Sequence, residues 1–463
     1  MSCYKSVPKY HQVLFGQDME KDAPHILLIN PWIHDFAAYD FWAKPLGLLG
    51  IAAILGTHGY TITYIDCLDR FHPKLTERQK TGEFGKGHYL KSPIPKPATL
   101  PDVARTYSRY GIPETLVRES LKKNPKPDVV LVTSLMTYWY PGVLAFIKIL
   151  HEMMPDVPVL LGGIYATLCH DHAVKHAGAD QVLGGTDEAK LLDLLDRMTG
   201  FGTRRQFVPN DLDTYPYPAF DLQHAISYIP ILTGRGCPFR CAYCASGFLN
   251  SRFTRRSPDH VIEEIVYWHE KHSVKDFAFY DDALLIDGDH HIMPILEGVI
   301  RRGISVRFHT PNALHIRPIT KEIAELLFRA GFETIRLGLE TAFFDHRKTL
   351  DSKVGPTEFE RAVRLLKKAG FQEGQMGAYL LFGLPGQDLE ELKASIKIVK
   401  GYGVRPVLAQ YSPIPHTTLW KDAVTASRYD LASDPLFHNN SIFPCQKEPF
   451  SWEKVALLKR LTQ

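Results

Sequence analysis

Apolar and polar positions along the first half of the chain switch repeatedly between a strand period and a helix period. Short apolar or alternating runs predict strands at 25–30, 61–66, 128–134, 157–161 and 180–183. The longer stretches between them predict helices at 45–57, 141–153 and 168–176, and a last helix that ends near Met198. Strands that alternate with helices predict a doubly wound parallel sheet.

The second half repeats the same alternation six times. Strands are predicted near 229–233, 277–281, 305–309, 334–339, 377–382 and 406–411. The helices between them are well marked: Ile323, Leu326, Leu327 and Ala330 share one face, and Gly331 ends that helix. Six parallel units of this kind predict a partial (β/α)6 barrel. In such barrels the functional groups gather at the carboxyl ends of the strands.

Breaks in these patterns divide the chain into four parts. We expect an α/β domain over 1–210, a linker rich in proline and short polar residues over 211–224, a barrel over 225–430 and a tail over 431–463 that packs on the barrel as a helix. The Lys- and Pro-rich stretch 70–127 interrupts the first domain, with one helix near 113–123. We interpret it as a partly ordered surface insertion that touches the active site.

Composition and charge narrow the class of protein. Apolar content of 45% and charged content of 23% over 463 residues are ordinary for a globular protein of two or three domains. The formal charge of +3 gives no reason to expect a nucleic-acid partner. The longest apolar run, 45–55, falls far short of the ~20 residues that span a bilayer. No signal peptide is evident, and the dispersed cysteines indicate a reducing, cytoplasmic compartment.

Three cysteines, Cys237, Cys241 and Cys244, follow the first barrel strand at C-x3-C-x2-C spacing. A [4Fe–4S] cluster is normally held by four thiolates, so a loop that offers three leaves one iron open to another ligand. A zinc site or a redox-active thiol pair is the alternative. Zinc sites usually show two separated pairs of ligands, and the sequence contains no second Cys or His pair of that form.

The spacing of these cysteines, with Tyr243 before the last one, resembles the cluster loop of the radical S-adenosylmethionine (SAM) superfamily. The resemblance implies that SAM chelates the open iron and is cleaved reductively to a 5′-deoxyadenosyl radical. It further implies that SAM is bound by residues of the loop and of the later strand ends. These residues are Phe239, Tyr243, Asp281, Asp282, Asn312, Glu340, Gly383 and Pro385. Asp281 and Asp282 stand where many members carry Gly-Gly-Glu. No catalytic side chain is assigned.

The first domain resembles the cobalamin-binding domain found ahead of the barrel in one branch of this superfamily. The resemblance rests on Leu28–Pro31, Pro45–Leu48, Leu161–Thr167 and Gly184–Glu188. It implies that a possible cobalamin site uses residues at two strand ends, namely Thr133, Ser134, Gly162, Gly163, Ala166 and Thr167. Turn formation alone is an alternative reason for these glycines.

The cobalt-ligating histidine of classical cobalamin domains, in Asp-x-His-x-x-Gly, has no counterpart here, because Asp66 is followed by Cys67 and Leu68. Members of this branch often lack that histidine, so cobalamin remains compatible with the chain. We interpret His34, His170 and His172, which lie nearby in the sequence, as ordinary loop or surface histidines.

The resemblance predicts a radical SAM enzyme with a [4Fe–4S] cluster, SAM and possibly cobalamin, reduced by a partner such as flavodoxin or ferredoxin. Methylation of an unreactive carbon on a small molecule or natural product is the leading hypothesis. The alternatives are a radical SAM cyclase, oxidoreductase or rearrangement enzyme whose first domain binds no cobalamin, and an iron–sulfur electron-transfer protein. The chain shows little room for an RNA-binding module, which disfavours a transfer-RNA methylthiotransferase.

Overall fold

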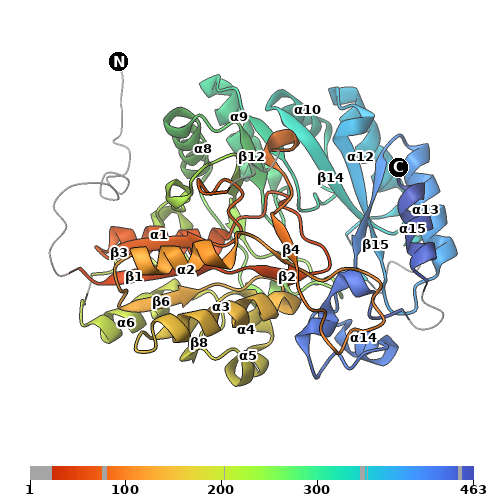
Figure 1. Cartoon of the computed structure of the whole chain (residues 1–463). Helices are drawn as coiled ribbons and strands as arrows, with labels where there is room; N and C mark the ends of the chain where they lie inside the picture. The colour runs from red at the N-terminus through yellow and green to blue at the C-terminus, as the bar shows by residue number, and fades with distance from the viewer. Residues whose placement is uncertain (1–22, 76–80, 203, 345–349, 352, 447–450) are drawn as a thin grey trace, which may run out of the picture. The chain divides into compact units, whose positions relative to one another are not determined.

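The computed structural model describes residues 23–75, 81–202, 204–344, 350–351, 353–446 and 451–463. The chain forms two compact units (Figure 1). The first contains Met1–Tyr39, Lys44–Lys80 and His88–Ala225, and the second contains Asp40–Ala43, Thr81–Gly87 and Ile226–Gln463. Two short segments of the amino-terminal half therefore fold with the barrel. The sequence pattern did not predict that these two segments would belong to the barrel unit.

The first unit is built on the predicted doubly wound sheet. Its five parallel strands run in the order β3-β1-β6-β7-β8. They are β1 (His25–Asn30), β3 (Thr61–Asp66), β6 (Val129–Val132), β7 (Val159–Leu161) and β8 (Gln181–Val182). β1 and β6 are buried along their whole length, which is why their sequences are continuously apolar. All five predicted strands are confirmed.

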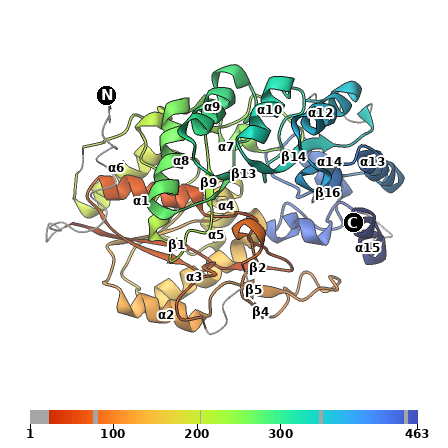
Figure 2. The ribbon, with the colours of Figure 1, turned by 90° about the horizontal axis from the view of Figure 1, so that it is seen from above.

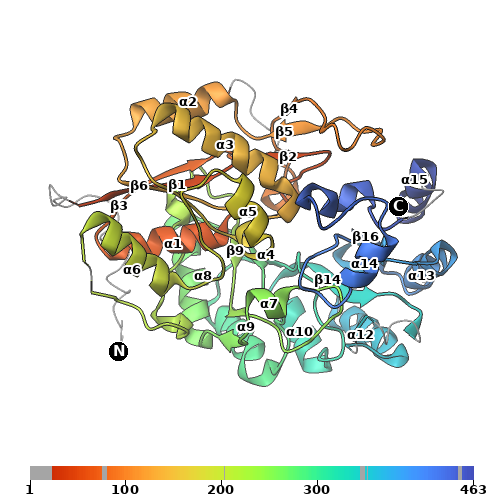
Figure 3. The same cartoon turned by 90° about the horizontal axis from the view of Figure 1, so that it is seen from below.

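Helices cover both faces of this sheet (Figure 3). α1 (Leu46–Thr57) and α6 (Glu188–Thr199) pack their apolar residues on one face, against Ile26, Leu28 and Val129. α3 (Tyr140–Met153) lies on the other face with α2 (Glu114–Lys123). The helix predicted over 168–176 is found as α5 (His170–His176). The short helix α4 (Ile164–Leu168), separated from α5 by a non-helical Cys169, was not predicted.

The insertion at 70–127 is ordered over most of its described residues. It contains the predicted helix, α2, and two short strands that the sequence did not reveal. β4 (Lys91–Pro93) and β5 (Ser108–Tyr110) form a three-stranded antiparallel sheet with β2 (Ile33–Asp35). Pro93 lies on the edge strand of this small sheet, where its missing N–H breaks no ladder.

The second unit contains the predicted six-stranded parallel sheet, in the order β16-β15-β14-β13-β12-β9. The strands are β9 (Ile229–Ile231), β12 (Asp276–Phe279), β13 (Arg307–His309), β14 (Phe332–Glu340), β15 (Met376–Phe382) and β16 (Arg405–Gln410). Figure 2 shows the helices between them arranged along the outer side of the strands. They are α8 (Pro258–His272), α9 (Ile292–Arg302), α10 (Lys321–Arg329), α12 (Pro356–Ala369) and α13 (Leu389–Gly401).

Two further α-helices follow the last strand among the described residues: α14 (Trp420–Ala426), and α15 (Trp452–Leu461) in the tail. α15 contacts α13, a helix of the barrel. Within the described part of the chain, no helix combines the length and the apolar character that crossing a membrane would need.

Trp42 fixes the amino-terminal segments to the barrel strands. Its indole is 1% exposed, stacks on His309 of β13 at 4.5 Å between ring centroids, and donates to the carbonyl of Phe84 at 3.0 Å. The Lys86 ammonium lies 4.6 Å from the same ring. Trp42 has a φ of +62°, which is costly for a bulky side chain and is tolerated only where the surroundings enforce it. The contacts around Trp42 therefore hold the segment Asp40–Ala43 against β13 and against the segment Thr81–Gly87.

We expect Trp42→Ala to lower the free energy of unfolding of the barrel by about 3–5 kcal/mol, because it leaves a cavity beside His309 and unpairs the Phe84 carbonyl. Urea unfolding followed by tryptophan fluorescence measures this loss. Trp452→Ala, at a half-buried position on α15, is the control and should cost clearly less. Equal losses in the two variants would contradict the role given to Trp42.

Candidate active site

The three cysteines lie in a loop at the carboxyl end of the first barrel strand. Gly236 opens the loop with a φ of +83°, and a Cβ there would lie 2.4 Å from the carbonyl oxygen of Arg252, so only glycine fits. The amide of Ala242 donates to the carbonyl of Leu350, and the amide of Leu419 donates to the carbonyl of Ala242. The loop is therefore tied to the segments that follow β14 and β16.

The thiols of Cys237, Cys241 and Cys244 are free, and Cys244 is exposed. Burial raises the pKa of the Cys237 thiol to about 11 and raises that of Cys241. No three His, Cys, Asp or Glu side chains among the described residues gather closely enough to hold a single metal ion. Three thiols presented by one loop are the donor set that a [4Fe–4S] cluster with one open iron requires.

Tyr243, Glu340 and Lys353 form a buried polar group beside the cysteine loop. The Tyr243 hydroxyl donates to Glu340 Oε1 at 2.9 Å, and the Lys353 ammonium donates to that hydroxyl at 3.1 Å. Lys353 Nζ also lies 3.6 Å from Glu340 Oε1, with the two side chains only 10% and 6% exposed. Burial, together with the Glu340 charge, raises the pKa of Tyr243 well above its usual value. The predicted residues Tyr243 and Glu340 are thus brought together, and Lys353 is a partner that the sequence did not reveal.

Glu340 occupies a strained position at the end of β14. Its φ is +61°, and the register between β14 and β15 shifts between Gly338 and Glu340. A bulge of this kind re-aims a side chain, and a non-glycine residue in this region costs roughly 1–3 kcal/mol. The bulge turns the Glu340 carboxylate toward Tyr243 of the cysteine loop. A ligand-binding role for Glu340 would explain why the backbone is strained at this residue.

The two adjacent aspartates after β12 have different surroundings. Asp281 accepts from the amide of Thr233 at 3.0 Å and from its hydroxyl at 2.7 Å, and that hydroxyl also contacts His291 at 2.7 Å. Burial raises the pKa of Asp281 to about 6. Asp281 therefore braces β9 against β12. Asp282 instead accepts from the hydroxyl of Ser246, just after the cysteine loop, and its charge acts on Cys237. The geometry favours Asp282 as the ligand-facing member of the pair.

The other predicted residues lie at neighbouring strand ends. Phe239 packs on the ring of His315 at 4.6 Å, and burial lowers the pKa of His315 to about 3. Asn312 donates to the carbonyl of Tyr280 at 2.7 Å, which links the ends of β12 and β13. Gly383 has a φ of +93°, and a Cβ there would lie 3.1 Å from the ring of Phe443. The positive φ and this close contact both favour glycine at this position, and Pro385 follows it in the same turn.

In the first unit, the predicted cobalamin residues also converge. The Ser134 hydroxyl donates to the carbonyl of Gly162 at 2.6 Å and accepts from the amide of Ala166 at 3.3 Å. The Thr167 hydroxyl donates to the carbonyl of Gly163 at 2.8 Å. With Thr133, these residues border the carboxyl ends of β6 and β7, next to the point where the strand order reverses. Ligands of doubly wound sheets bind at such points.

The glycines at this edge differ in the room around them and in their conformation. A Cβ on Gly162 would meet nothing nearer than 3.9 Å, so a side chain there would enter free space. A Cβ on Gly185 would meet nothing within 4 Å, but the φ of +87° at Gly185 by itself favours glycine. Gly163 is different, because a Cβ there would lie 2.2 Å from the carbonyl oxygen of Ser134. Turn formation therefore explains Gly163 and Gly185, whereas Gly162 leaves room for close approach to the backbone.

The nearby histidines have partners or are buried. His172 Nδ1 contacts the Tyr165 hydroxyl at 2.8 Å, and its ring packs against Tyr140. Burial lowers the pKa of His34, in β2, to about 4. The His170 side chain is about half exposed and lies near Gly184. These surroundings are those of ordinary structural histidines, and none of the contacts assigns one of them to a cobalt ion.

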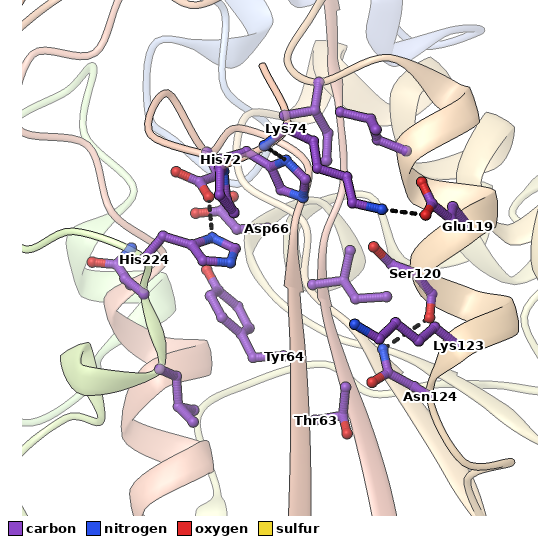
Figure 4. Close-up of a pocket in the computed structure, with 17 residues that line it drawn as sticks. Thr63, Tyr64, Asp66, His72, Lys74, Glu119, Ser120, Lys123, Asn124 and His224 are labelled. Atoms are coloured by element: carbon purple, nitrogen blue, oxygen red, sulfur yellow. Dashed lines mark hydrogen bonds and ion pairs between the residues drawn. The ribbon is translucent and has the colours of Figure 1, made fainter. Parts of the chain in front are cut away.

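A separate cavity of about 320 Å³ lies beside the edge strand β3 (Figure 4). Two pairs of its charged groups are in contact: Lys74 with Glu119, and Asp69 with His224 at 2.5 Å. The figure shows the Lys74–Glu119 pair on one side and His224 above Tyr64 on the other. The predicted cobalamin residues do not line this cavity, and no sequence pattern predicted it.

Two family models match the chain, one in each unit. The radical SAM superfamily model matches residues 231–399, and the B12 binding domain model matches residues 107–195. The first match begins in β9 and includes the three cysteines. The second includes the six residues predicted to border cobalamin.

Similar proteins are methyltransferases and a cyclase. A protein of Pyrococcus horikoshii named as an uncharacterized methyltransferase is 25% identical over 68% of this chain and 74% of its own. Cytidylyl-2-hydroxyethylphosphonate methyltransferase of Streptomyces wedmorensis is 21% identical over 80% of this chain and 76% of its own. Anaerobic magnesium-protoporphyrin IX monomethyl ester cyclase of Rubrivivax gelatinosus is 25% identical over 67% of this chain and 60% of its own.

Solved structures share the fold. The radical SAM methyltransferase TsrM of Kitasatospora setae, solved with cobalamin and a [4Fe–4S] cluster, matches with a TM-score of 0.64 at 16% identity, over 88% of this chain and 76% of that one. The cobalamin-dependent radical enzyme OxsB, solved with aqua-cobalamin and SAM, matches with a TM-score of 0.57 at 13% identity, over 87% of this chain and 55% of that one.

We expect Cys237→Ala, Cys241→Ala and Cys244→Ala each to lower the iron bound after anaerobic reconstitution and to abolish SAM cleavage. Two thiolates cannot replace three at a cubane with one open iron. Iron analysis and chromatography of 5′-deoxyadenosine measure the two effects. Cys445→Ala is the matched control, because that thiol is buried in the tail, where it contacts the carbonyl of Ala423. Cleavage retained in any of the three variants would refute the ligand assignment.

Asp281 should make the stability of the barrel depend on pH. Its pKa in the folded chain is about 6 against an ordinary 3.8, so the folded state holds the proton where the unfolded state has lost it. The contribution of the Asp281 carboxyl to the free energy of unfolding is therefore greatest below pH ~4. It falls by on the order of 3 kcal/mol as the pH rises through ~6. Asp281→Asn removes this dependence.

The difference in urea-unfolding free energy between wild type and Asp281→Asn, measured across this pH range, isolates the group from other titrations. Parallel pH curves for the two proteins would show that Asp281 has no shifted pKa.

Proposed function

Since the chain is a radical SAM enzyme that carries a B12-binding domain, we propose that it methylates an unreactive carbon of a small molecule or natural product in a cobalamin-dependent reaction. The observation that carries this proposal is that one chain contains both a three-thiol cluster loop and an open, glycine-lined sheet edge. Relatives named as methyltransferases support it.

The protein binds, orients and encloses the cofactors and the substrate, while the cofactors supply the chemistry. When bound, the cluster and SAM would supply a 5′-deoxyadenosyl radical, and cobalamin would supply methyl transfer. Cys237, Cys241 and Cys244 would hold the cluster. Thr133, Ser134, Gly162, Gly163, Ala166 and Thr167 would border cobalamin, and Gly185 leaves room beside them.

Residues around the cysteine loop would position SAM. Glu340 and Asp282 are carboxylates that can accept hydrogen bonds from the amino group and the ribose hydroxyls of SAM. Lys353 is a cation within reach of Glu340, and it can pair with the carboxylate of SAM. Tyr243 holds Glu340 in place through its hydroxyl. Phe239, Asn312, Gly383 and Pro385 complete the proposed SAM site, with Asp281 bracing the strand beneath Asp282.

The enzyme would also need an electron donor, and a flavodoxin or ferredoxin is the class that fits. Free, dispersed cysteines fit a reducing cytoplasmic compartment, where such donors are found. A cyclase, oxidoreductase or rearrangement enzyme with an empty first domain is the competing function. The similarity to a magnesium-protoporphyrin ester cyclase keeps that alternative open.

Product analysis separates these functions. We expect anaerobically reconstituted protein, supplied with SAM, dithionite and hydroxocobalamin, to retain the corrinoid and to form both S-adenosylhomocysteine and 5′-deoxyadenosine. Gly162→Leu should fill the free space at the sheet edge. The variant should lose the corrinoid and S-adenosylhomocysteine while still forming 5′-deoxyadenosine. Gly374→Leu, at an exposed glycine with nothing within 4 Å of its Cβ, is the control and should lose neither.

Wild-type protein that forms 5′-deoxyadenosine without retaining any corrinoid would favour the competing function. Retention of corrinoid without S-adenosylhomocysteine would argue against methyl transfer.

A further inference from the structure

The cysteine loop and the segment after it carry a local excess of positive charge. Residues 234–258 contain five arginines and no aspartate or glutamate, whereas the whole chain has a formal charge of only +3. The five are Arg235, Arg240, Arg252, Arg255 and Arg256. Such an excess over 25 residues, within a nearly neutral protein, creates a local positive potential rather than a general affinity for polyanions.

The arginines divide into structural and exposed members. Arg256 makes a buried ion pair with Glu264, and Arg255 bonds to Asp287 at 3.1 Å while covering the ring of Phe253. Arg240 and Arg252 are exposed, and within the described residues neither makes an ion pair. Two guanidinium groups beside the cysteine loop therefore keep their charge available to another molecule.

Both exposed arginines lie close to the thiols. Arg240 directly precedes Cys241 in the loop. Arg252 follows the loop by eight residues, but the antiparallel pairing of β10 (Gly234–Arg235) with β11 (Thr254–Arg255) folds it back, so that its carbonyl packs on Gly236. Arg240 thus lies within the loop itself, and the backbone of Arg252 lies against the residue that opens the loop.

Exposed aromatic side chains accompany these charges. Phe248, in α7 (Ser246–Leu249), is 48% exposed, and its ring stacks on His416 with centroids 4.1 Å apart. Phe253 is 37% exposed beneath Arg255. Aromatic residues and arginine are the types enriched at protein–protein interfaces. Cys244, four residues before Phe248, is the exposed thiol of the loop.

We propose that Arg240, Phe248, Arg252 and Phe253 form the docking surface for a small acidic protein that carries single electrons. This inference rests on the proposed function, which requires a cluster at the loop. On docking, the reduced carrier would lose one electron and the cluster would gain it, with no other group exchanged. Electron transfer weakens steeply with distance, so a donor must approach the loop itself, and these four exposed residues lie in the loop or within nine residues of its last cysteine.

The character of the surface fits such a partner. Complexes between electron-transfer proteins bury little area and depend on charge steering for their rate of encounter. Arg240 and Arg252 would steer an acidic carrier, while Phe248 and Phe253 would supply apolar contact at short range. The rate of association with the carrier should fall as the salt concentration rises. The reason is that charges are screened over ~8 Å at physiological ionic strength and over ~3 Å at 1 M.

The test compares two electron donors on the reconstituted holoenzyme. The variants are Arg252→Glu, Arg240→Glu and the double variant, and the probe is reduced flavodoxin. Stopped-flow bleaching of the cluster absorbance measures the rate of reduction directly. We expect a fall of roughly threefold for each single variant and tenfold for the double at low salt, with the difference lost at 1 M salt. Flavodoxin affinity, measured by titration calorimetry, should fall in parallel.

Arg329→Glu is the matched control, because it makes the same charge change at an exposed position in the last turn of α10, which leads to the opposite end of the strands. It should leave the rate of reduction by flavodoxin unchanged. All variants should cleave SAM normally in excess dithionite, where reduction is not rate-limiting. Wild type that fails to cleave SAM with dithionite would refute the proposed function instead of the docking surface.

Normal cleavage with dithionite, combined with unchanged reduction of the double variant by flavodoxin, would overturn the docking surface. A salt-sensitive RNA affinity that the double variant loses, with unchanged reduction by flavodoxin, would also overturn it.

Discussion

Parallel pairing of the six barrel strands is the constraint on which the candidate site depends. Because β9 to β16 all run in one direction, their carboxyl ends and the loops that follow them meet at one end of the sheet. Cys237 and Leu419 are far apart in the sequence, yet the backbone of Ala242 bonds to both Leu350 and Leu419. The cysteine loop owes its place to these backbone bonds. Its thiols can then share one site with Glu340 and Lys353.

The structure accepts an energetic cost at this end of the sheet. Glu340 takes a left-handed conformation at a bulge, and Lys353 is buried with it. Breaking a buried ion pair is expensive, but replacing one with well-packed apolar residues is often neutral, so stability alone does not require the pair. A ligand with both an ammonium and a carboxylate group, such as SAM, gives a physical reason for both charges. Strain and buried charge at one point are common at binding sites.

The sequence was sufficient for those features that depend on local patterns. Apolar runs identified the strands of both sheets, and the cysteine spacing identified the loop. The sequence pattern could not predict contacts between distant segments. Trp42 and Lys86 pack with the barrel, although both precede the linker by more than a hundred residues. Lys353 has no motif of its own and is recognised only by its distance to Tyr243. Asp281 and Asp282 are adjacent and chemically identical, and only their partners, Thr233 and Ser246, distinguish them.

The central claim is that three thiolates hold a four-iron cluster whose remaining iron accepts SAM. Electron paramagnetic resonance of the anaerobically reconstituted, reduced protein tests this claim most directly. Mössbauer spectroscopy of the same protein identifies the type of cluster. We expect a [4Fe–4S]⁺ signal whose g-values shift when SAM is added, because SAM becomes a ligand of the open iron. A protein with no cubane, or with a cubane whose spectrum is indifferent to SAM, would contradict the account.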